Sequence, residues 1–244
     1  MSSKKTNRSS ESDMEFIARQ LRKPSGDFAE TIAEKMNQGN KPLFDLTLET
    51  MIPSDGERIL EIGFANGKFF KELHNCASQL KIYGIDLSEE MVKSAARENK
   101  ELIRDRKLKL IQGSSDALPF EDQFFDKVFC NMVIYFWEYP AAHLSEIERI
   151  LKPGGSFYTG FRPKESMLQF PFVRFGFTLY EIDEWSDILR GSGFDVTDVA
   201  KRSDPVFKDG EERVRLQSVC IKAMKVGAAG FEPRKHRLRN RNEG

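Results

Sequence analysis

The stretch that decides the fold of this chain is Arg58-Ile59-Leu60-Glu61-Ile62-Gly63-Phe64-Ala65-Asn66-Gly67-Lys68-Phe69. Its first half is a short apolar run, partly β-branched, which is typical of a parallel strand covered on both faces. The glycines that follow let the backbone turn sharply and come close to a ligand. Their spacing is GxAxG after an acidic residue, whereas a dinucleotide pyrophosphate is held by GxGxxG. The stretch predicts a nucleotide-type site and disfavours a nicotinamide cofactor.

A second strand that ends in an acidic residue follows about twenty residues later. It reads Lys81-Ile82-Tyr83-Gly84-Ile85-Asp86-Leu87-Ser88, and Ser88 is placed to cap the next helix. In doubly wound folds an acidic side chain at this position binds a ribose hydroxyl, which makes Asp86 the candidate ribose ligand. The alternative is that Asp86 is an ordinary aspartate at a helix entry.

Strand and helix patterns alternate through the rest of the chain. Strands are predicted at 58–63, 81–86, 107–112, 125–131, 156–160, 194–200 and 214–224, and helices at 141–151 and 180–189. Alternation of this kind requires right-handed crossovers. We therefore expect an α/β fold with a doubly wound, seven-stranded, mostly parallel sheet and a final antiparallel strand.

Four segments are expected along the chain. Residues 1–13 are polar and predicted to be disordered, and 14–52 form a helical leader or cap with breaks at 24–26 and 38–42. Residues 53–225 form the main domain. Residues 226–244 form a basic disordered tail.

Four motifs in order resemble those of the class I S-adenosylmethionine-dependent methyltransferases. They are LEIGFANG, YGIDLS, QGSSDALPFEDQFFDKVFCNMVIYF and ILKPGGSFY, within Glu57 to Lys225. Within that class the chain is most similar to the C-methyltransferases of ubiquinone and menaquinone biosynthesis. The resemblance implies a Rossmann-like methyltransferase fold and S-adenosylmethionine as cofactor. It also implies an enzyme that moves a methyl group to a small-molecule acceptor by direct displacement.

The resemblance also assigns cofactor contacts to single residues. The loop around the methionine part of the cofactor is matched by Glu61, Gly63, Ala65 and Gly67, and the ribose ligand by Asp86. The adenine-binding loop is matched by Ser115, Asp116 and Ala117, with Leu87 on the adenine face. The pocket around the methyl group is matched by Asn131. Ala65 departs from the family by replacing the usual middle glycine. Because alanine resists positive φ, this replacement puts the exact loop conformation in question.

An aromatic-rich segment, Met167 to Tyr180, follows the fifth predicted strand. A second ligand of a doubly wound fold binds beyond the carboxyl ends of the strands, where such a segment would lie. The predicted acceptor-binding residues are Tyr135, Trp137, Phe172, Phe175 and Phe177, and the candidate pocket also includes Phe136. The alternative is that these aromatics fill the edge of the core.

Catalytic and metal-binding residues are sparse. His143 is the candidate general base, the alternative being a histidine on a helix surface, and no other catalytic residue is identified. Asn131-Met132-Val133-Ile134 lacks the prolines of an NPPY tetrad, which disfavours N-methylation of adenine or glutamine. Three widely spaced cysteines predict neither a zinc site nor disulfides, and they favour a cytoplasmic location.

Composition is that of a soluble globular protein, with 39% hydrophobic residues and 38 acidic against 38 basic side chains. Zero net charge disfavours nucleic-acid binding over the whole surface, and only the basic run 234–241 suggests an RNA or acidic-partner contact. A non-catalytic cofactor-binding or RNA-interacting accessory protein is the alternative function. Neither a signal peptide nor a membrane span is expected, and the protein is expected to be a monomer or a homodimer.

Overall fold

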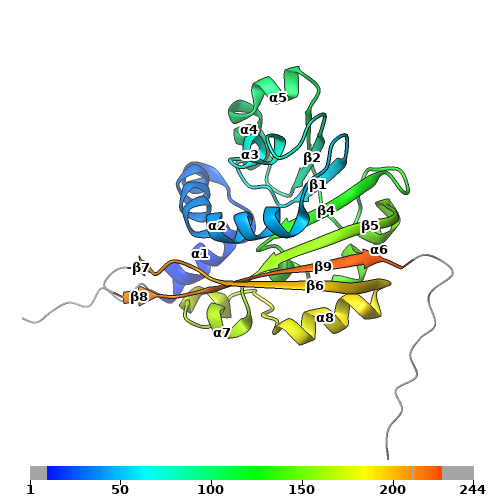
Figure 1. The fold of residues 1–244 in the computed structure, drawn as a ribbon. Coiled ribbons are helices and arrows are strands. Elements are labelled where there is room, and N and C mark those ends of the chain that lie inside the picture. Colours follow the sequence, from blue (N-terminus) through cyan, green and yellow to red (C-terminus); the bar gives the residue numbers. More distant parts are fainter. Residues whose placement is uncertain (1–9, 210–211, 227–244) are drawn as a thin grey trace, which may run out of the picture.

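The computed structural model describes residues 10–209 and 212–226 (Figure 1). The predicted disorder of residues 1–9 and the predicted basic tail from 227 onward lie outside this range. Val226 itself donates its backbone N–H to the Gly193 carbonyl, so the main domain continues one residue past its predicted end.

Seven strands form one sheet, as predicted. Their order is β3 (Leu108–Gln112), β2 (Lys81–Asp86), β1 (Arg58–Ile62), β4 (Phe125–Asn131), β5 (Leu151–Phe161), β9 (Gln217–Lys225) and β6 (Phe194–Ser203). Neighbours from β3 to β5 are parallel, and β9 runs antiparallel to both β5 and β6. The doubly wound sheet with one antiparallel strand is therefore confirmed.

The last strand was predicted too long. Val214 belongs to β8 (Glu212–Val214), which pairs with β7 (Phe207–Asp209) in a separate hairpin, and β9 begins only at Gln217. The fifth strand was predicted too short. β5 starts at Leu151, and its register against β4 shifts between the Phe125 pair and the Lys127 pair, where the turn residues 152–155 are accommodated.

Alternating side chains build one apolar core on each face of the sheet. Ile59 packs on the face covered by α2 (Ala29–Met51), α3 (Phe70–His74), α4 (Glu89–Glu98) and α5 (Lys100–Arg104). Leu60 packs on the other face, beneath α6 (Pro140–Ile150) and α8 (Ile182–Gly191). Because each fully buried aliphatic side chain contributes about 1.5–3 kcal/mol, the two cores fix the sheet against its helices. Among the described residues no helix is long and apolar enough to cross a membrane.

The N-terminal helix starts earlier than predicted. α1 (Glu11–Arg22) begins with a capping box in which the Ser10 side chain accepts from the Asp13 backbone and the Asp13 side chain accepts from the Ser10 backbone. Residues 11–13 are therefore helical, which corrects their predicted disorder. A short helical turn, η1 (Gly26–Phe28), follows at the predicted break. α1 packs against another short helical turn, η3 (Pro171–Arg174), which follows α7 (Lys164–Met167) in the chain.

The second predicted helix break, at 38–42, is wrong. α2 runs through Pro42 as one helix and changes direction along its length (Figure 1). Proline removes one backbone N–H and crowds the preceding turn, which normally bends or ends a helix. The turn before Pro42 is also held from outside the helix, because Arg162 Nη2 donates to the Gly39 carbonyl at 2.7 Å and Nη1 donates to Asn40 Oδ1 at 3.0 Å.

A buried ion pair holds that arginine in place. Arg162 and Asp204 are 3% and 5% exposed, and their Nη2 to Oδ2 distance is 2.8 Å. Ser218 Oγ donates to the other Asp204 oxygen at 2.6 Å, and Tyr135 Oη donates to the Arg162 carbonyl at 2.7 Å. The pair thereby joins α2 to the ends of β5 and β6, and Ser218 links it to the start of β9.

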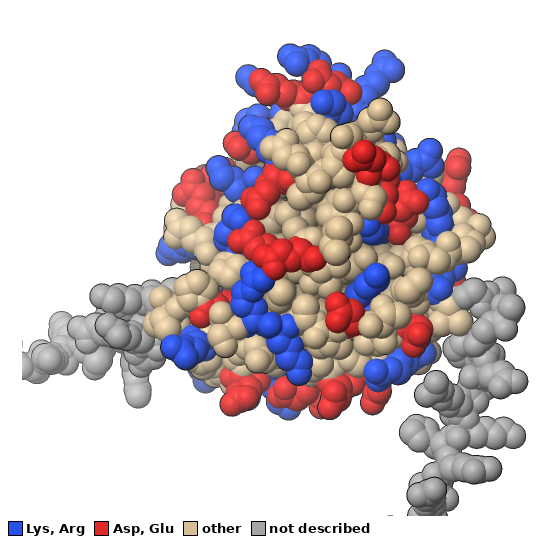
Figure 2. All heavy atoms as spheres, viewed as in Figure 1, with Lys and Arg blue, Asp and Glu red and all other residues tan. Residues whose placement is uncertain are grey.

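The face of the molecule in Figure 2 carries interspersed acidic and basic side chains, and no extended area of it has a single sign. A pair on the surface serves as the natural comparison for the buried one. Arg202 and Glu49 form an ion pair whose side chains are 38% and 59% exposed.

We predict that Asp204→Ala lowers the free energy of unfolding by about 3–5 kcal/mol, because it leaves the Arg162 guanidinium buried without its counter-ion. Glu49→Gln, which removes the exposed pair, should cost less than about 1 kcal/mol. Urea denaturation of both variants checks the difference. Equal losses would show that the Arg162 pair does not anchor α2.

Candidate functional site

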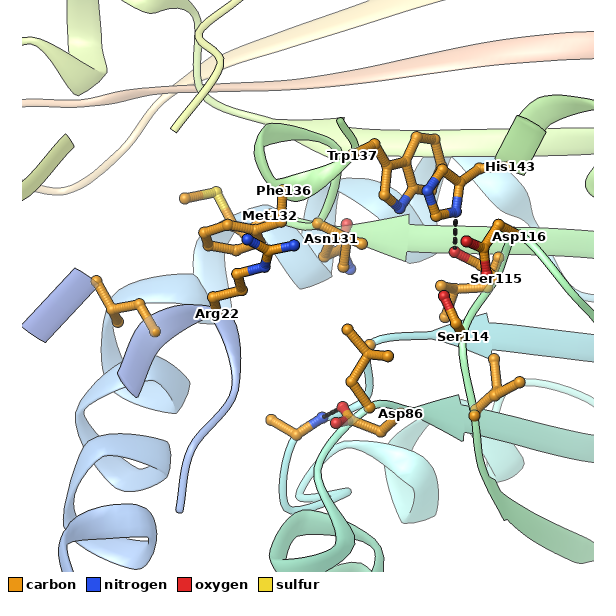
Figure 3. A pocket seen from close by; sticks show the side chains of 18 of the residues that line it. Arg22, Asp86, Ser114, Ser115, Asp116, Asn131, Met132, Phe136, Trp137 and His143 are labelled. Atoms are coloured by element: carbon orange, nitrogen blue, oxygen red, sulfur yellow. Dashed lines mark hydrogen bonds between the residues drawn. The ribbon is translucent and has the colours of Figure 1, made fainter. Parts of the chain in front are cut away.

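A cavity of about 430 Å³ opens at the carboxyl ends of β1, β2 and β4 (Figure 3). The sheet order reverses here, since β1 leads to β2 and β3 on one side and lies beside β4 on the other. Ligands of doubly wound sheets bind at such a switch point. The cavity is within the size range of small-molecule and cofactor sites.

Asp86 lies in this cavity at the end of β2. Its carboxylate accepts the backbone N–H of Ala65 at 2.9 Å and that of Ser88 at 2.9 Å. Burial raises the pKa of Asp86 to about 6, while the two N–H donors act to lower it. Above that pH an ionised carboxylate faces the cavity, which suits the two hydroxyls of a ribose. Ser88 caps α4 as predicted, since its Oγ accepts the Met91 N–H at 3.2 Å.

The glycine-rich turn passes through the left-handed region three times. Gly63, Ala65 and Gly67 have φ of 73°, 50° and 67°. Ala65 therefore adopts the conformation that its side chain disfavours, at a cost of about 1–2 kcal/mol. Gly63 and Ala65 line the cavity.

Gly67, for which a contact with the methionine part of the cofactor is predicted, packs against the neighbouring helices. It does not line the cavity, and a Cβ on it would lie 2.7 Å from Ala95 Cβ and 2.9 Å from the Phe70 ring. The absent side chain lets the turn pack on α3 and α4. At Gly63, by contrast, a Cβ would lie 2.4 Å from Val133 Cγ2. The absence of a side chain at Gly63 therefore lets the loop after β4 pack closely against the turn.

Glu61 is a buried carboxyl two residues before that turn. It is 7% exposed and has no hydrogen-bond partner among the described residues that would stabilise its charge. Burial, with a smaller contribution from the negative charge of Asp86, raises the pKa of Glu61 to about 8. Glu61 is therefore protonated at neutral pH, and it does not line the cavity.

The end of the cavity opposite the glycine turn is formed by the loop after β3. Ser115 and Asp116 line it, and the Ser115 Oγ is 2.8 Å from His143 Nδ1. His143 stacks on Trp137 with ring centroids 4.6 Å apart and an interplanar angle of 6°. Burial lowers the pKa of His143, and Asp116 opposes that shift. Leu87 lines the cavity with 40% of its surface exposed, whereas Ala117 lies outside the lining.

Asn131 ends β4 near the middle of the cavity (Figure 3). Its Oδ1 accepts from Thr47 Oγ1 of α2 at 2.8 Å, and its Nδ2 is buried without a partner among the described residues. A Cβ on Gly160 would lie 1.8 Å from that Oδ1, so the neighbouring strand needs a glycine there. Thr47 was not identified from the sequence, because nothing local in α2 indicates its contact with β4.

The predicted acceptor-binding aromatics are not brought together. Of the five, only Trp137 lines the cavity. Tyr135 is buried in the core with its hydroxyl bonded to Arg162. Phe172 and Phe177 pack on each other at 5.7 Å between ring centroids, and the Arg174 guanidinium lies over Phe175.

Phe136, which belongs to the predicted pocket, also lines the cavity and comes from η2 (Ile134–Phe136). Other lining residues were not identified from the sequence. Met132 precedes η2, Tyr139 precedes α6, and Leu21, Arg22, Pro24 and Met36 come from the N-terminal helical segment. An aromatic run after the fourth strand signals Phe136, but the N-terminal residues have no local signal. Among the described residues no three His, Cys, Asp or Glu side chains are grouped to hold a metal ion.

The fold and the cavity define a Rossmann-like protein built to hold a nucleoside-containing cofactor. Comparison with known proteins agrees, since the family model described as "Methyltransferase domain" matches residues 60–159. Uncharacterized methyltransferase YdaC of Bacillus subtilis is 32% identical over 127 residues, which are 52% of this chain and 68% of that protein. Demethylmenaquinone methyltransferase of Clavibacter sepedonicus is 30% identical over 146 residues, 59% of this chain and 56% of that protein.

A solved structure shares the fold more completely. The methyltransferase seen in complex with the Haloferax volcanii Trm112 activator has a TM-score of 0.71 at 20% identity, covering 88% of this chain and 98% of that one. Several other curated relatives are matched over only about half of their length. The chain belongs to the class I S-adenosylmethionine-dependent methyltransferases, and the family predicted from its motifs is confirmed.

We predict that Glu61 makes the cofactor-free protein less stable as pH rises. An unfolded glutamate releases its proton near pH 4.5 and the folded one only near pH 8, so between these values the native state binds more protons and unfolding becomes easier with rising pH. Glu61→Gln should remove this loss and melt higher than wild type at pH 8. Thermal melts of ligand-stripped protein from pH 5 to pH 8.5 test this, with the exposed Glu121→Gln as control. Parallel wild-type and Glu61→Gln curves would refute the assignment.

Proposed function

We propose that this protein binds S-adenosylmethionine in the described cavity and transfers its methyl group to a small, largely apolar acceptor. The observation that carries the proposal is the half-buried Asp86 carboxylate, which is held by two backbone N–H groups at the end of β2 and lines the cavity. A carboxylate held in this way can accept hydrogen bonds from both hydroxyls of a ribose without reorganising.

The chain offers a fitting contact for each part of the cofactor. Ser115 and Asp116 would bind the adenine edge with Leu87 against its face, and Asp86 the ribose. The turn at Gly63 and Ala65 would carry the amino-acid end, where a bulkier side chain would obstruct a ligand. The buried Nδ2 of Asn131, unpartnered among the described residues, fits a site that gains a polar contact when filled.

When bound, the cofactor supplies an electrophilic methyl on a sulfonium, so transfer is a direct displacement that needs in-line positioning. An apolar wall beside Asn131 is formed by Phe136, Met132 and Val133. This wall would exclude water and orient an apolar acceptor. We propose that His143 shapes the adenine end and is not the base, because its ring is fixed between Ser115 and Trp137. The proposed acceptor is accordingly one that needs no proton removed by this residue.

Turnover distinguishes an enzyme from a binding protein. Incubation with S-adenosylmethionine carrying a deuterated methyl group and a cell extract should yield S-adenosylhomocysteine and a labelled metabolite. Binding without S-adenosylhomocysteine would favour a non-catalytic cofactor-binding protein. An RNA-interacting accessory role rests on residues 234–241, which lie outside the described part of the chain, and it predicts RNA binding without formation of S-adenosylhomocysteine.

We predict that Asp86→Ala weakens S-adenosylmethionine binding by roughly 2–3 kcal/mol, the range expected for lost hydrogen bonds to a charged group. Titration calorimetry on the folded variant measures this, with the exposed Asp105→Asn as control. The affinity of the wild type should also fall below about pH 6, where Asp86 takes up a proton. An unchanged affinity in Asp86→Ala would end the ribose assignment.

We predict opposite effects for two phenylalanines. Phe136→Ala should reduce methyl transfer to the extract while the affinity for the cofactor stays near wild type, since Phe136 lines the cavity wall. Phe172→Ala should lower the free energy of unfolding by about 1–3 kcal/mol and leave the turnover of folded molecules unchanged, because its ring packs at the core. Melting temperature, cofactor affinity and turnover are measured on both. If Phe172→Ala lost methyl transfer and Phe136→Ala did not, the acceptor site would have to be assigned to the 167–180 segment.

A further inference from the structure

One basic side chain reaches the cavity from the N-terminal helix. Arg22 is the last residue of α1, and it is the only Lys or Arg among the described residues that line the cavity. Figure 3 shows its guanidinium beside Phe136 and Met132, on the side opposite Ser115, Asp116 and His143.

The other charged groups of the lining are of the opposite sign. Asp86, Asp116 and Glu138 line the same cavity. Three carboxylates suit the positive sulfonium and ammonium groups of S-adenosylmethionine as well as its hydroxyls, but they repel its carboxylate. Arg22 therefore supplies the one complementary charge that this group needs.

Arg22 has no ion-pair or hydrogen-bond partner for its side chain within residues 10–209 and 212–226. Other arginines in the structure do, such as Arg149 with Glu146 at 2.8 Å and Arg162 with Asp204 at 2.8 Å. Arg22 is exposed, so its guanidinium is available to an anion in the cavity. Its planar fork matches a carboxylate in two parallel hydrogen bonds.

The end of α1 is fixed to the turn that bears Asp86. Ser88 Oγ donates to the Pro24 carbonyl at 2.5 Å, and the Ser25 N–H donates to Gln20 Oε1 at 2.9 Å. Arg22 lies two residues from Pro24, and Ser88 lies two residues from Asp86. These contacts keep the candidate ribose ligand and the guanidinium in one framework.

We propose that Arg22 binds the carboxylate of the cofactor's methionine moiety, which makes α1 part of the cofactor site. The inference rests on the proposed function. With the adenine at Ser115 and Asp116 and the ribose at Asp86, the amino-acid end passes the Gly63 turn toward the side of the cavity where Arg22 lies. An anionic group on the acceptor is the other possible source of a carboxylate, and the experiment separates the two.

The test compares S-adenosylmethionine with its decarboxylated form, which differs only in lacking the carboxylate. Calorimetric titrations without acceptor are run on wild type, Arg22→Gln, Arg22→Lys and Arg19→Gln. Arg19 is the matched control, because it is exposed on the same helix and outside the cavity lining. Arg22→Gln should bind S-adenosylmethionine about tenfold to a hundredfold more weakly and the decarboxylated form no more weakly than wild type. Arg22→Lys should keep part of the affinity, and Arg19→Gln all of it.

Other results overturn the inference. Equal weakening of both ligands in Arg22→Gln would indicate a structural role for the side chain. Unchanged affinity for S-adenosylmethionine with a raised acceptor KM would assign the guanidinium to the acceptor. Failure of wild type to bind S-adenosylmethionine would overturn the proposed function itself, and this inference with it, which is distinguishable from failure in the variant alone.

Discussion

The site depends on a backbone constraint, the passage of the Gly63–Gly67 turn through positive φ. This conformation aims the Ala65 N–H at Asp86 and brings the Gly63 N–H to the Ile85 carbonyl at 2.8 Å. Two neighbouring strand ends are thereby joined by two hydrogen bonds. The missing side chain at Gly63 leaves space for Val133, so the same turn also sets how closely the loop after β4 approaches.

The same region is electrostatically unfavourable in the free protein. Glu61 is buried and Asp86 half-buried, and desolvation raises the pKa of both, so each would gain from a positive charge nearby. Stability is reduced at neutral pH where such groups must either stay protonated or ionise without a partner. Local rules are commonly violated at functional sites, and a cationic cofactor is the kind of ligand that offsets this violation. Arg22 is the basic exception in this acidic lining, and the carboxylate of the cofactor is the group that we propose it binds.

The sequence predicts most of what lies within one strand and the turn after it. Asp86 and Ala65 could be placed because strand, turn and helix signals there are local and agree with each other. Arg22 and Thr47 could not, because helix packing over long sequence separations brings Arg22 to the cavity and Thr47 to Asn131. The break predicted at Pro42 is wrong for a related reason, because the turn before it is held by Arg162, which lies far away in the chain. Phe172 and Phe177 illustrate the ambiguity of aromatic runs, where the composition of a pocket and that of a core are alike.

The two N-terminal helices are attached to the domain with unequal strength. The second half of α2 buries Leu43, Phe44 and Leu46 and is bonded to Asn131 and Arg162. α1 buries only Ala18 and Gln20, and its end is held by the Ser88 contact to Pro24. Segments with few buried apolar contacts open at lower free energy than the core. We therefore expect cofactor exchange to displace α1 and leave α2 in place, so that the residue proposed to bind the carboxylate also belongs to the part of the cap that opens most easily.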